Sequence, residues 1–253
     1  MSRLSETFSK RKALITFITA GDPSLSVTEK LIYDLEKSGS DVIELGIPFS
    51  DPLADGPVIQ ASHLRALKKN VSLSDVFKLV SRVRKKTNIP ICFMLSYNLI
   101  LKYGLENFYE QAGRVGVDGV IVPDLPPEES KVQSPKPPVD TIFLVAPTST
   151  DKRIKLIAEK ASGFIYLISS TGITGKREKL AEDLKNLVSR IRRYSKLPVA
   201  VGFGISKPSQ ASEVAKIADG VIVGSAIVDL IAKKKFKSVS KFVSSLRKAI
   251  DVG

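Results

Sequence analysis

Two carboxyl groups in the stretch "DVIELGIPFSDPLADG", residues 41–56, have the type and position for acid–base chemistry. Glu44 interrupts an apolar run typical of a strand that is covered on both faces. An ionised carboxylate in such a strand costs several kcal/mol, roughly, unless it is paired or neutralised. Burial raises the pKa of a carboxyl group because it disfavours the charged form. Glu44 is therefore a candidate to give and take protons near neutral pH.

Asp55 is the second candidate, because it follows in the loop after the run that carries Glu44. Two carboxyl groups at one site can divide the roles of acid and base. Each residue also has a structural interpretation, which the sequence leaves open. Backbone amides or an arginine would satisfy a structural Glu44. Asp55 alone would fit an Asp-Gly turn or the N-cap of a helix over 57–67.

Three glycine-containing loops form a second candidate site. They read "STGITGKR", "GFGIS" and "VGSAIVDL", and their candidate residues are Thr174, Gly175, Gly204, Gly224 and Ser225. Each glycine alone is an ordinary turn residue. Together, bare backbone amides and the start of a helix are typical of a phosphate site, so the sequence predicts a phosphate ester as substrate.

Short β-rich runs alternate with helical patterns along the sequence, which predicts an α/β fold. The strands and helices of this fold must position the candidate residues. Eight such runs indicate a single (β/α)8 TIM barrel over 1–253, with an extra N-terminal helix and extra helices between the second and third strands. An open doubly wound sheet is the alternative, but no G-x-G-x-x-G follows the first run. The runs lie at 13–19, 42–47, 89–95, 119–123, 141–147, 163–169, 198–204 and 220–225.

Side chains of a barrel strand alternate between the interior and the helices. The apolar residues of the second run share one direction and are expected to face the helices, which places Glu44 inside the barrel toward its carboxyl end. TIM-barrel active sites lie at that end. On the first run, Phe17 and Thr19 are the expected inward neighbours.

Helix boundaries have recognisable signals in four places. Ser24, Ser72, Thr150 and Pro208 stand at the starts of helical patterns. Residues 126–139, "PPEESKVQSPKPPV", fit less well, because three prolines near the end of the segment exclude a continuing helix. They predict a short helix followed by an extended connection.

Composition excludes several classes of protein. The chain has one cysteine, Cys92, and one histidine, His63, so neither an internal disulfide nor a metal cluster built on these residue types is expected. It has no apolar run of membrane-spanning length and no signal-peptide pattern, which predicts a soluble cytoplasmic protein that does not bind a membrane. The net charge of +13 falls largely on helical faces, which favours solvated surface over a nucleic-acid site.

At this point the sequence resembles one family closely, the tryptophan synthase alpha subunit. The run "ELGIPFSDPLADGPVIQ" is similar to the signature of that family nearly throughout, and "TAGDP", "GVDGVIVPDLPPEE", "FLVAPTST", "SSTGITG", "VGFGIS" and "GSAIV" match its later blocks in order. The resemblance implies a lyase that cleaves indole-3-glycerol phosphate to indole and glyceraldehyde 3-phosphate without a cofactor or metal. It also implies a beta subunit that carries pyridoxal phosphate, in an assembly of two alpha and two beta subunits that meet near Pro48, Phe49 and Pro52.

The resemblance also implies residue roles. Glu44 matches the family's catalytic glutamate, and Asp55 matches its catalytic aspartate. Phe17 and Tyr166 match side chains near the indole ring and glycerol chain. The phosphate cradle is matched by Gly175, Gly204, Gly224 and Ser225, and the mobile loop by Thr174. Two features depart from the family pattern: Ser96 stands where a tyrosine is frequent, and the 126–139 segment is short.

Two other functions remain as alternatives. One is a different barrel enzyme that acts on a phosphorylated substrate, such as an isomerase of histidine or tryptophan synthesis. The other is a basic barrel that binds RNA or an anionic ligand without catalysis, which would show salt-dependent binding that survives the loss of Glu44.

Overall fold

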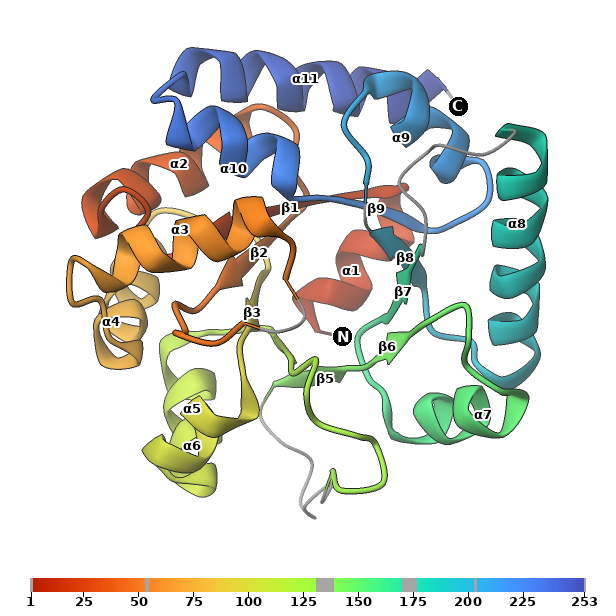
Figure 1. The fold of residues 1–253 in the computed structure, drawn as a ribbon, viewed down its shortest axis with the longest axis horizontal. Coiled ribbons are helices and arrows are strands. Elements are labelled where there is room, and N and C mark those ends of the chain that lie inside the picture. The colour runs from red at the N-terminus through yellow and green to blue at the C-terminus, as the bar shows by residue number, and fades with distance from the viewer. Residues whose placement is uncertain (1, 53–54, 131–138, 170–176, 203, 253) are drawn as a thin grey trace.

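A ring of parallel strands surrounded by helices forms the fold (Figure 1). The computed structural model describes residues 2–52, 55–130, 139–169, 177–202 and 204–252. The strands are β1 (Ala13–Thr19), β2 (Val42–Gly46), β3 (Ile91–Met94), β4 (Gly119–Ile121), β5 (Asp140–Ile142), β6 (Leu144–Val145), β7 (Ile165–Ile168), β8 (Val199–Gly202) and β9 (Gly220–Val223). Their order in the sheet is β5-β4-β3-β2-β1-β9-β8-β7-β6, and every pair is parallel.

The predicted TIM barrel is therefore confirmed, with one strand divided. Strands β5 and β6 stand at the two ends of the sheet order, yet only Phe143 separates them in the chain. β5 pairs with β4, whereas β6 pairs with β7. The predicted fifth run thus closes the ring as one stretch of chain that bonds to a different neighbour on either side of Phe143.

Helices cover the outside of the ring. They are α1 (Arg3–Lys10), α2 (Leu25–Lys37), α3 (Pro57–Leu67), α4 (Leu73–Val83), α5 (Tyr97–Tyr103), α6 (Leu105–Val115), α7 (Asp151–Lys160), α8 (Arg177–Tyr194), α9 (Pro208–Ala215), α10 (Ser225–Ala232) and α11 (Phe236–Val252). The predicted starts are confirmed: Ser24, Ser72 and Thr150 cap α2, α4 and α7 with their side chains, and Pro208 begins α9.

The 126–139 segment differs from its prediction. Residues 126–130 form a turn instead of the expected short helix, with the amides of Glu129 and Ser130 both bonded to the carbonyl of Pro126. The adjacent prolines Pro126 and Pro127 have no N–H groups to extend that turn backwards, and the rest of the segment, 131–138, lies outside the described residues.

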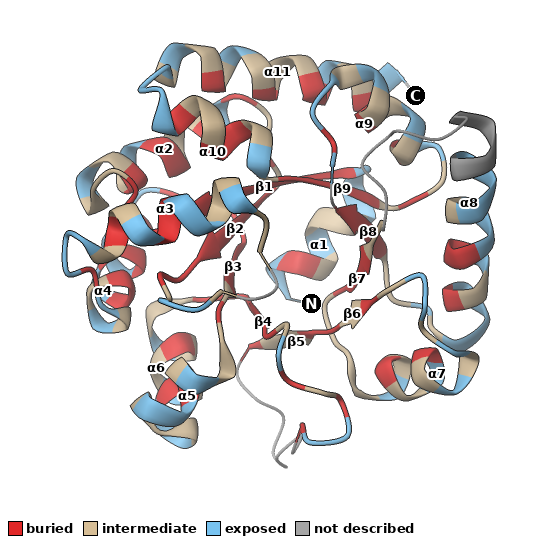
Figure 2. Cartoon of the chain, in the orientation of Figure 1, coloured by how far each residue is buried: buried red, intermediate tan, exposed pale blue. Residues whose placement is uncertain are grey.

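The ring of strands is the most continuously buried part of the chain (Figure 2), and successive strand residues belong in alternation to two core clusters. Ile43, Leu45 and Ile47 pack with the helices in the largest core cluster, whereas Val42 belongs to a separate cluster inside the barrel. Leu4 of α1 joins this interior cluster and is fully buried. Helix α1 therefore closes the amino end of the barrel, which leaves the carboxyl end as the open mouth.

Four matching hydrogen-bond pairs, which we call the clamps, tie neighbouring strands together at the amino end. Each pair joins a residue at or near the start of one strand to a residue of the preceding barrel strand. The first residue donates its backbone N–H to the carbonyl of the second. The second residue donates its own backbone N–H to a side-chain oxygen of the first. The pairs are Asp41 with Leu14, Asp118 with Ile91, Ser162 with Thr141 and Asp219 with Val199, with side-chain distances of 2.7, 2.8, 2.9 and 3.0 Å.

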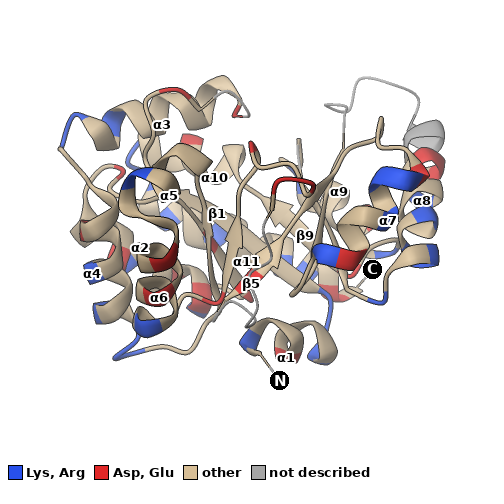
Figure 3. Ribbon diagram, turned by 90° about the horizontal axis from the view of Figure 1, so that it is seen from below, with Lys and Arg blue, Asp and Glu red and all other residues tan. Residues whose placement is uncertain are grey.

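Lysine and arginine are distributed over the outer helices on both sides of the molecule (Figure 3). This distribution fits a solvated surface better than one nucleic-acid groove. Among the described residues, no helix has both the length and the apolar character needed to cross a membrane.

Candidate active site

A cavity of about 360 Å³ opens at the carboxyl end of the barrel. Every predicted site residue that the structure describes lines it: Phe17, Glu44, Asp55, Tyr166, Gly204, Gly224 and Ser225. The other two predicted residues, Thr174 and Gly175, lie outside the described residues. Met94, Ile59 and Ile222 add an apolar wall that the sequence analysis did not name.

Glu44 is the buried acid of this cavity. Its side chain points into the barrel from β2, opposite Phe17 of β1 in the strand register, and the residue is 1% exposed. Within the described part of the chain, Oε2 has no hydrogen-bond partner, so neither an arginine nor a backbone amide satisfies that oxygen as a purely structural interpretation requires. Burial, followed by the nearby charge of Asp55, raises the pKa of Glu44 to about 8. Glu44 is therefore a protonated acid at neutral pH.

This raised pKa predicts a pH-dependent stability. Between about pH 4.5 and about pH 8, the folded protein keeps a proton on Glu44 that the unfolded chain has lost, so stability falls as pH rises. The loss is about 1.4 kcal/mol per pH unit, on the order of 5 kcal/mol in total. Glu44→Gln has no such proton and should gain stability relative to wild type as pH rises. Urea unfolding of both proteins across this range measures the difference, and parallel pH curves would contradict the raised pKa.

Asp55 does not cap helix α3. The N-cap is Gly56, which makes no side-chain bond, and Pro57 is the first helical residue. The backbone N–H of Asp55 donates to the Pro52 carbonyl at 3.0 Å. Gln60 Nε2 donates to the Asp55 carbonyl at 2.8 Å. These bonds hold the backbone of Asp55 and leave its carboxylate on the cavity wall, next to the space that Glu44 lines.

Two aromatic side chains line the cavity from the strands, and each needs a glycine beside it. A Cβ atom on Gly46 would lie 2.5 Å from Phe17 Cζ, and one on Gly202 would lie 2.6 Å from the Tyr166 hydroxyl oxygen. Burial and the charges of Glu44 and Asp55 raise the pKa of Tyr166 well above its usual value. Its neutral hydroxyl is therefore a hydrogen-bond donor at any pH at which the protein would work.

Gly204, Gly224 and Ser225 lie on the other side of the cavity. Gly204 has a φ of +74°, a backbone conformation that other residue types rarely adopt. Gly224 is the N-cap residue of α10, and Ser225 is the first residue of that helix. The free amides at the start of α10 therefore border the cavity, and they favour an anionic group there.

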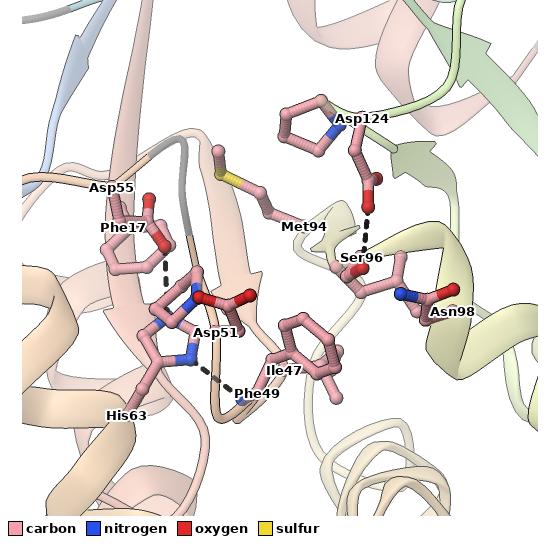
Figure 4. Close-up of a pocket in the computed structure, with 14 residues that line it drawn as sticks. Phe17, Ile47, Phe49, Asp51, Asp55, His63, Met94, Ser96, Asn98 and Asp124 are labelled. Atoms are coloured by element: carbon pink, nitrogen blue, oxygen red, sulfur yellow. Dashed lines mark hydrogen bonds and ion pairs between the residues drawn. The ribbon is translucent and has the colours of Figure 1, made fainter.

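A second, smaller cavity of about 130 Å³ adjoins the first and shares Phe17, Asp55 and Met94 with it (Figure 4). Its wall includes Ser96, which departs from the family pattern. Ser96 Oγ donates to Asp124 Oδ2 at 2.6 Å, and the Tyr97 N–H donates to Asp124 Oδ1 at 2.9 Å. The hydroxyl of Ser96 is thus committed to Asp124 at the start of α5.

His63 is a candidate site residue that the sequence analysis missed, because histidine was weighed there only as a metal ligand. The residue lies on α3, is 4% exposed and contacts Asp55. Its position, eight residues after Asp55 on the helix that follows the loop, is a signal that could have pointed to this contact. In the part of the chain that the structure describes, no group of three or more His, Cys, Asp or Glu side chains could hold a metal ion.

Comparisons with known proteins agree with this geometry. The family model for the tryptophan synthase alpha chain matches residues 4–250. A tryptophan synthase alpha chain from Thermoanaerobacter sp. is 49% identical over 95% of this chain and 94% of its own length. The crystal structure of tryptophan synthase subunit alpha from Legionella pneumophila is 39% identical, covers 100% of both chains and has a TM-score of 0.91. A chain of Mycobacterium tuberculosis tryptophan synthase is 34% identical, covers 100% of this chain and 99% of its own, and has a TM-score of 0.90.

Proposed function

Since the chain belongs to the tryptophan synthase alpha chain family, we propose that it is a lyase that cleaves indole-3-glycerol phosphate to indole and glyceraldehyde 3-phosphate in the larger cavity. The observation that carries the proposal is the buried Glu44 carboxyl group, protonated at neutral pH and placed beside Asp55. A protonated acid next to a carboxylate is the pair that this carbon–carbon cleavage requires.

The proposed reaction moves one proton at a time through Glu44. Its carboxyl group first protonates C3 of the indole ring, which places a positive charge on the ring nitrogen. The resulting carboxylate then accepts the proton of the C3′ hydroxyl as the bond between C3 and C3′ breaks, which gives the aldehyde and returns the electron pair to the ring. The carboxylate of Asp55 accepts a hydrogen bond from the indole N–H, so it stabilises the charge that develops there.

The direct test supplies indole-3-glycerol phosphate to the purified protein and measures indole and glyceraldehyde 3-phosphate. Both products should appear in equal amounts. An isomerase that acts on the same class of substrate would consume it without releasing indole, and a barrel that only binds anions would leave it unchanged. Either result would contradict the proposal.

The substrate phosphate should bind at the start of α10, where the amides of Gly224 and Ser225 border the cavity. Because backbone amides supply most of this binding, Ser225→Ala should raise KM only about 5-fold, which corresponds to one hydrogen bond of about 1 kcal/mol. Gly224→Val should raise KM by about 10-fold or more, since even a Cβ atom there lies 3.3 Å from Phe17 Cβ. Steady-state kinetics compares the two variants, and a Ser225→Ala effect larger than that of Gly224→Val would contradict this placement.

The proposal includes a beta subunit that carries pyridoxal phosphate, in an assembly of two alpha and two beta subunits. The family name supports such a partner, and Asp55 supplies a physical reason for it. Asp55 shares the loop between β2 and α3 with Pro48, Phe49 and Pro52, so a partner that docks on this loop would hold the carboxylate in place. The proposed location is the cytoplasm, which fits a chain with a single cysteine.

Adding the cognate beta subunit should raise kcat of the alpha reaction about 10-fold or more. A bound partner would order the loop between β2 and α3 in advance, so the reaction would no longer have to offset the loss of backbone entropy that ordering this loop causes. A steady-state assay with and without the beta subunit measures the activation, and size-exclusion chromatography measures the complex. If the two proteins neither co-migrate nor change the rate, the protein acts as a lyase on its own.

A further inference from the structure

The imidazole of His63 contacts two different parts of the active-site loop. Its Nδ1 accepts a hydrogen bond from the backbone N–H of Phe49 at 3.1 Å. Its Nε2 lies 3.3 Å from Asp55 Oδ2, at ion-pair distance but without the alignment of a hydrogen bond. Figure 4 shows both contacts as dashed lines that reach the ring from the start and the end of the loop between β2 and α3.

The contact with Phe49 fixes which nitrogen carries the proton. A nitrogen that accepts a hydrogen bond has no proton of its own, so the neutral imidazole must carry its proton on Nε2. That nitrogen faces the carboxylate of Asp55. The described residues that line the smaller cavity include three aspartates, Asp51, Asp55 and Asp124, but neither a lysine nor an arginine. Among these lining residues, His63 is thus the only one with a cationic form.

The direction of the contact leaves the larger cavity free. Asp55 lines both cavities, whereas His63 lines only the smaller one and Glu44 only the larger one. His63 therefore reaches Asp55 from the smaller cavity, whereas Glu44 shares the larger cavity with Asp55. A donor on that side can hold Oδ2 while the other carboxylate oxygen remains available to a ligand N–H.

We propose that His63 is a positioning residue for Asp55, an inference that rests on the proposed lyase reaction. Its neutral ring donates through Nε2 to the carboxylate, while Nδ1 anchors the ring to the backbone of Phe49. The 3.3 Å contact shortens to a hydrogen bond when substrate orders the loop, since catalytic hydrogen bonds are often long before the ligand binds.

Two amide variants separate this role from a purely structural one. A glutamine can place its NH2 group near the position of Nε2, and an asparagine can place its carbonyl oxygen near that of Nδ1. His63→Gln therefore keeps the donor to Asp55 and loses the bond from Phe49, whereas His63→Asn does the reverse. His63→Ala loses both.

Steady-state kinetics of the three variants tests the proposal. His63→Ala should lower kcat about 10-fold with little change in KM, because misplacement of a supporting group acts on the transition state. His63→Gln should recover most of that loss, and His63→Asn should not. If His63→Asn recovers activity and His63→Gln does not, the ring serves the loop backbone alone and the proposal is wrong.

A double-mutant cycle gives a second readout that loss of stability would not produce. In the Asp55→Asn background, His63→Ala should lower kcat less than 2-fold further, since its effect passes through the carboxylate. The same approximately 10-fold loss in both backgrounds would show independent action and would overturn the proposal, even if neither amide variant recovers activity.

The single histidine also allows a measurement that needs no turnover. In tag-free, 15N-labelled wild type at mildly alkaline pH, the two ring nitrogens of His63 give the only histidine side-chain signals. NMR should show an unprotonated Nδ1 and a protonated Nε2, and the opposite tautomer or a mixture would overturn the proposal. Wild type that fails to release indole contradicts the lyase function instead, so the two failures are distinguishable.

Discussion

Glu44→Gln should lower kcat by at least about 100-fold and leave KM within a few-fold of wild type. General acid–base catalysis contributes at least ~100-fold, and the substitution removes the proton while it keeps almost the same volume. The fold should survive, because the neutral amide resembles the protonated carboxyl group that the buried site already holds at neutral pH. Steady-state kinetics with indole-3-glycerol phosphate measures the loss, and a thermal melt of the same preparation confirms the fold.

A matched control for this variant is Glu110→Gln, which makes the same chemical change at an exposed position on α6. It should leave kcat unchanged. Glu44→Gln with more than about a tenth of the wild-type kcat would show that Glu44 does not transfer the proton, because so small a loss lies below the contribution expected of a general acid.

Asp55→Asn should lower kcat by about 100-fold, since it removes the negative charge that stabilises the developing charge on the indole nitrogen. It should also move the pH profile. The charge of Asp55 is one of the two causes that raise the pKa of Glu44, so without it that pKa should fall, although burial, the larger cause, should keep it above its usual value. The activity that depends on protonated Glu44 should then be lost at lower pH than in wild type.

Asp51→Asn is the control, because Asp51 is an exposed aspartate on the same loop and lines only the smaller cavity. It should change kcat less than about 3-fold, as expected of a surface charge that touches no reacting atom. Equal losses in the two variants would indicate that the loop needs acidic charge in general and that Asp55 has no specific role.

Most of the barrel could be predicted from the sequence because its strands are short apolar runs bounded by turn residues. The period of two along a strand then predicts that Glu44 lies inside the barrel. The division of the fifth strand at Phe143 had no such signal. It depends on which neighbour each half pairs with, and this is a property of the closed ring that the apolar run "TIFLVAP" does not encode locally.

The position of the Asp55 carboxylate was harder to predict, because Asp55 taken alone fits an Asp-Gly turn or an N-cap. Gly56, and not Asp55, is the N-cap of α3, and the Asp55 carboxylate contacts His63. Both facts depend on how the loop folds back on α3. Spacing along the chain shows that His63 follows Asp55, but not that one ring nitrogen reaches Phe49 while the other faces the carboxylate.

The four clamps divide the barrel into four units of two barrel strands, each joined by the same pair of bonds at the amino end. Consider a circularly permuted chain whose new ends lie between two units, for example in the connection from α4 to β3. In this chain, the two strands that each clamp joins still follow one another directly along the sequence. A chain opened within a unit, such as between α2 and β2, must form one clamp from the two ends of the new chain. Tolerance to permutation should therefore alternate around the ring, high at one connection and low at the next.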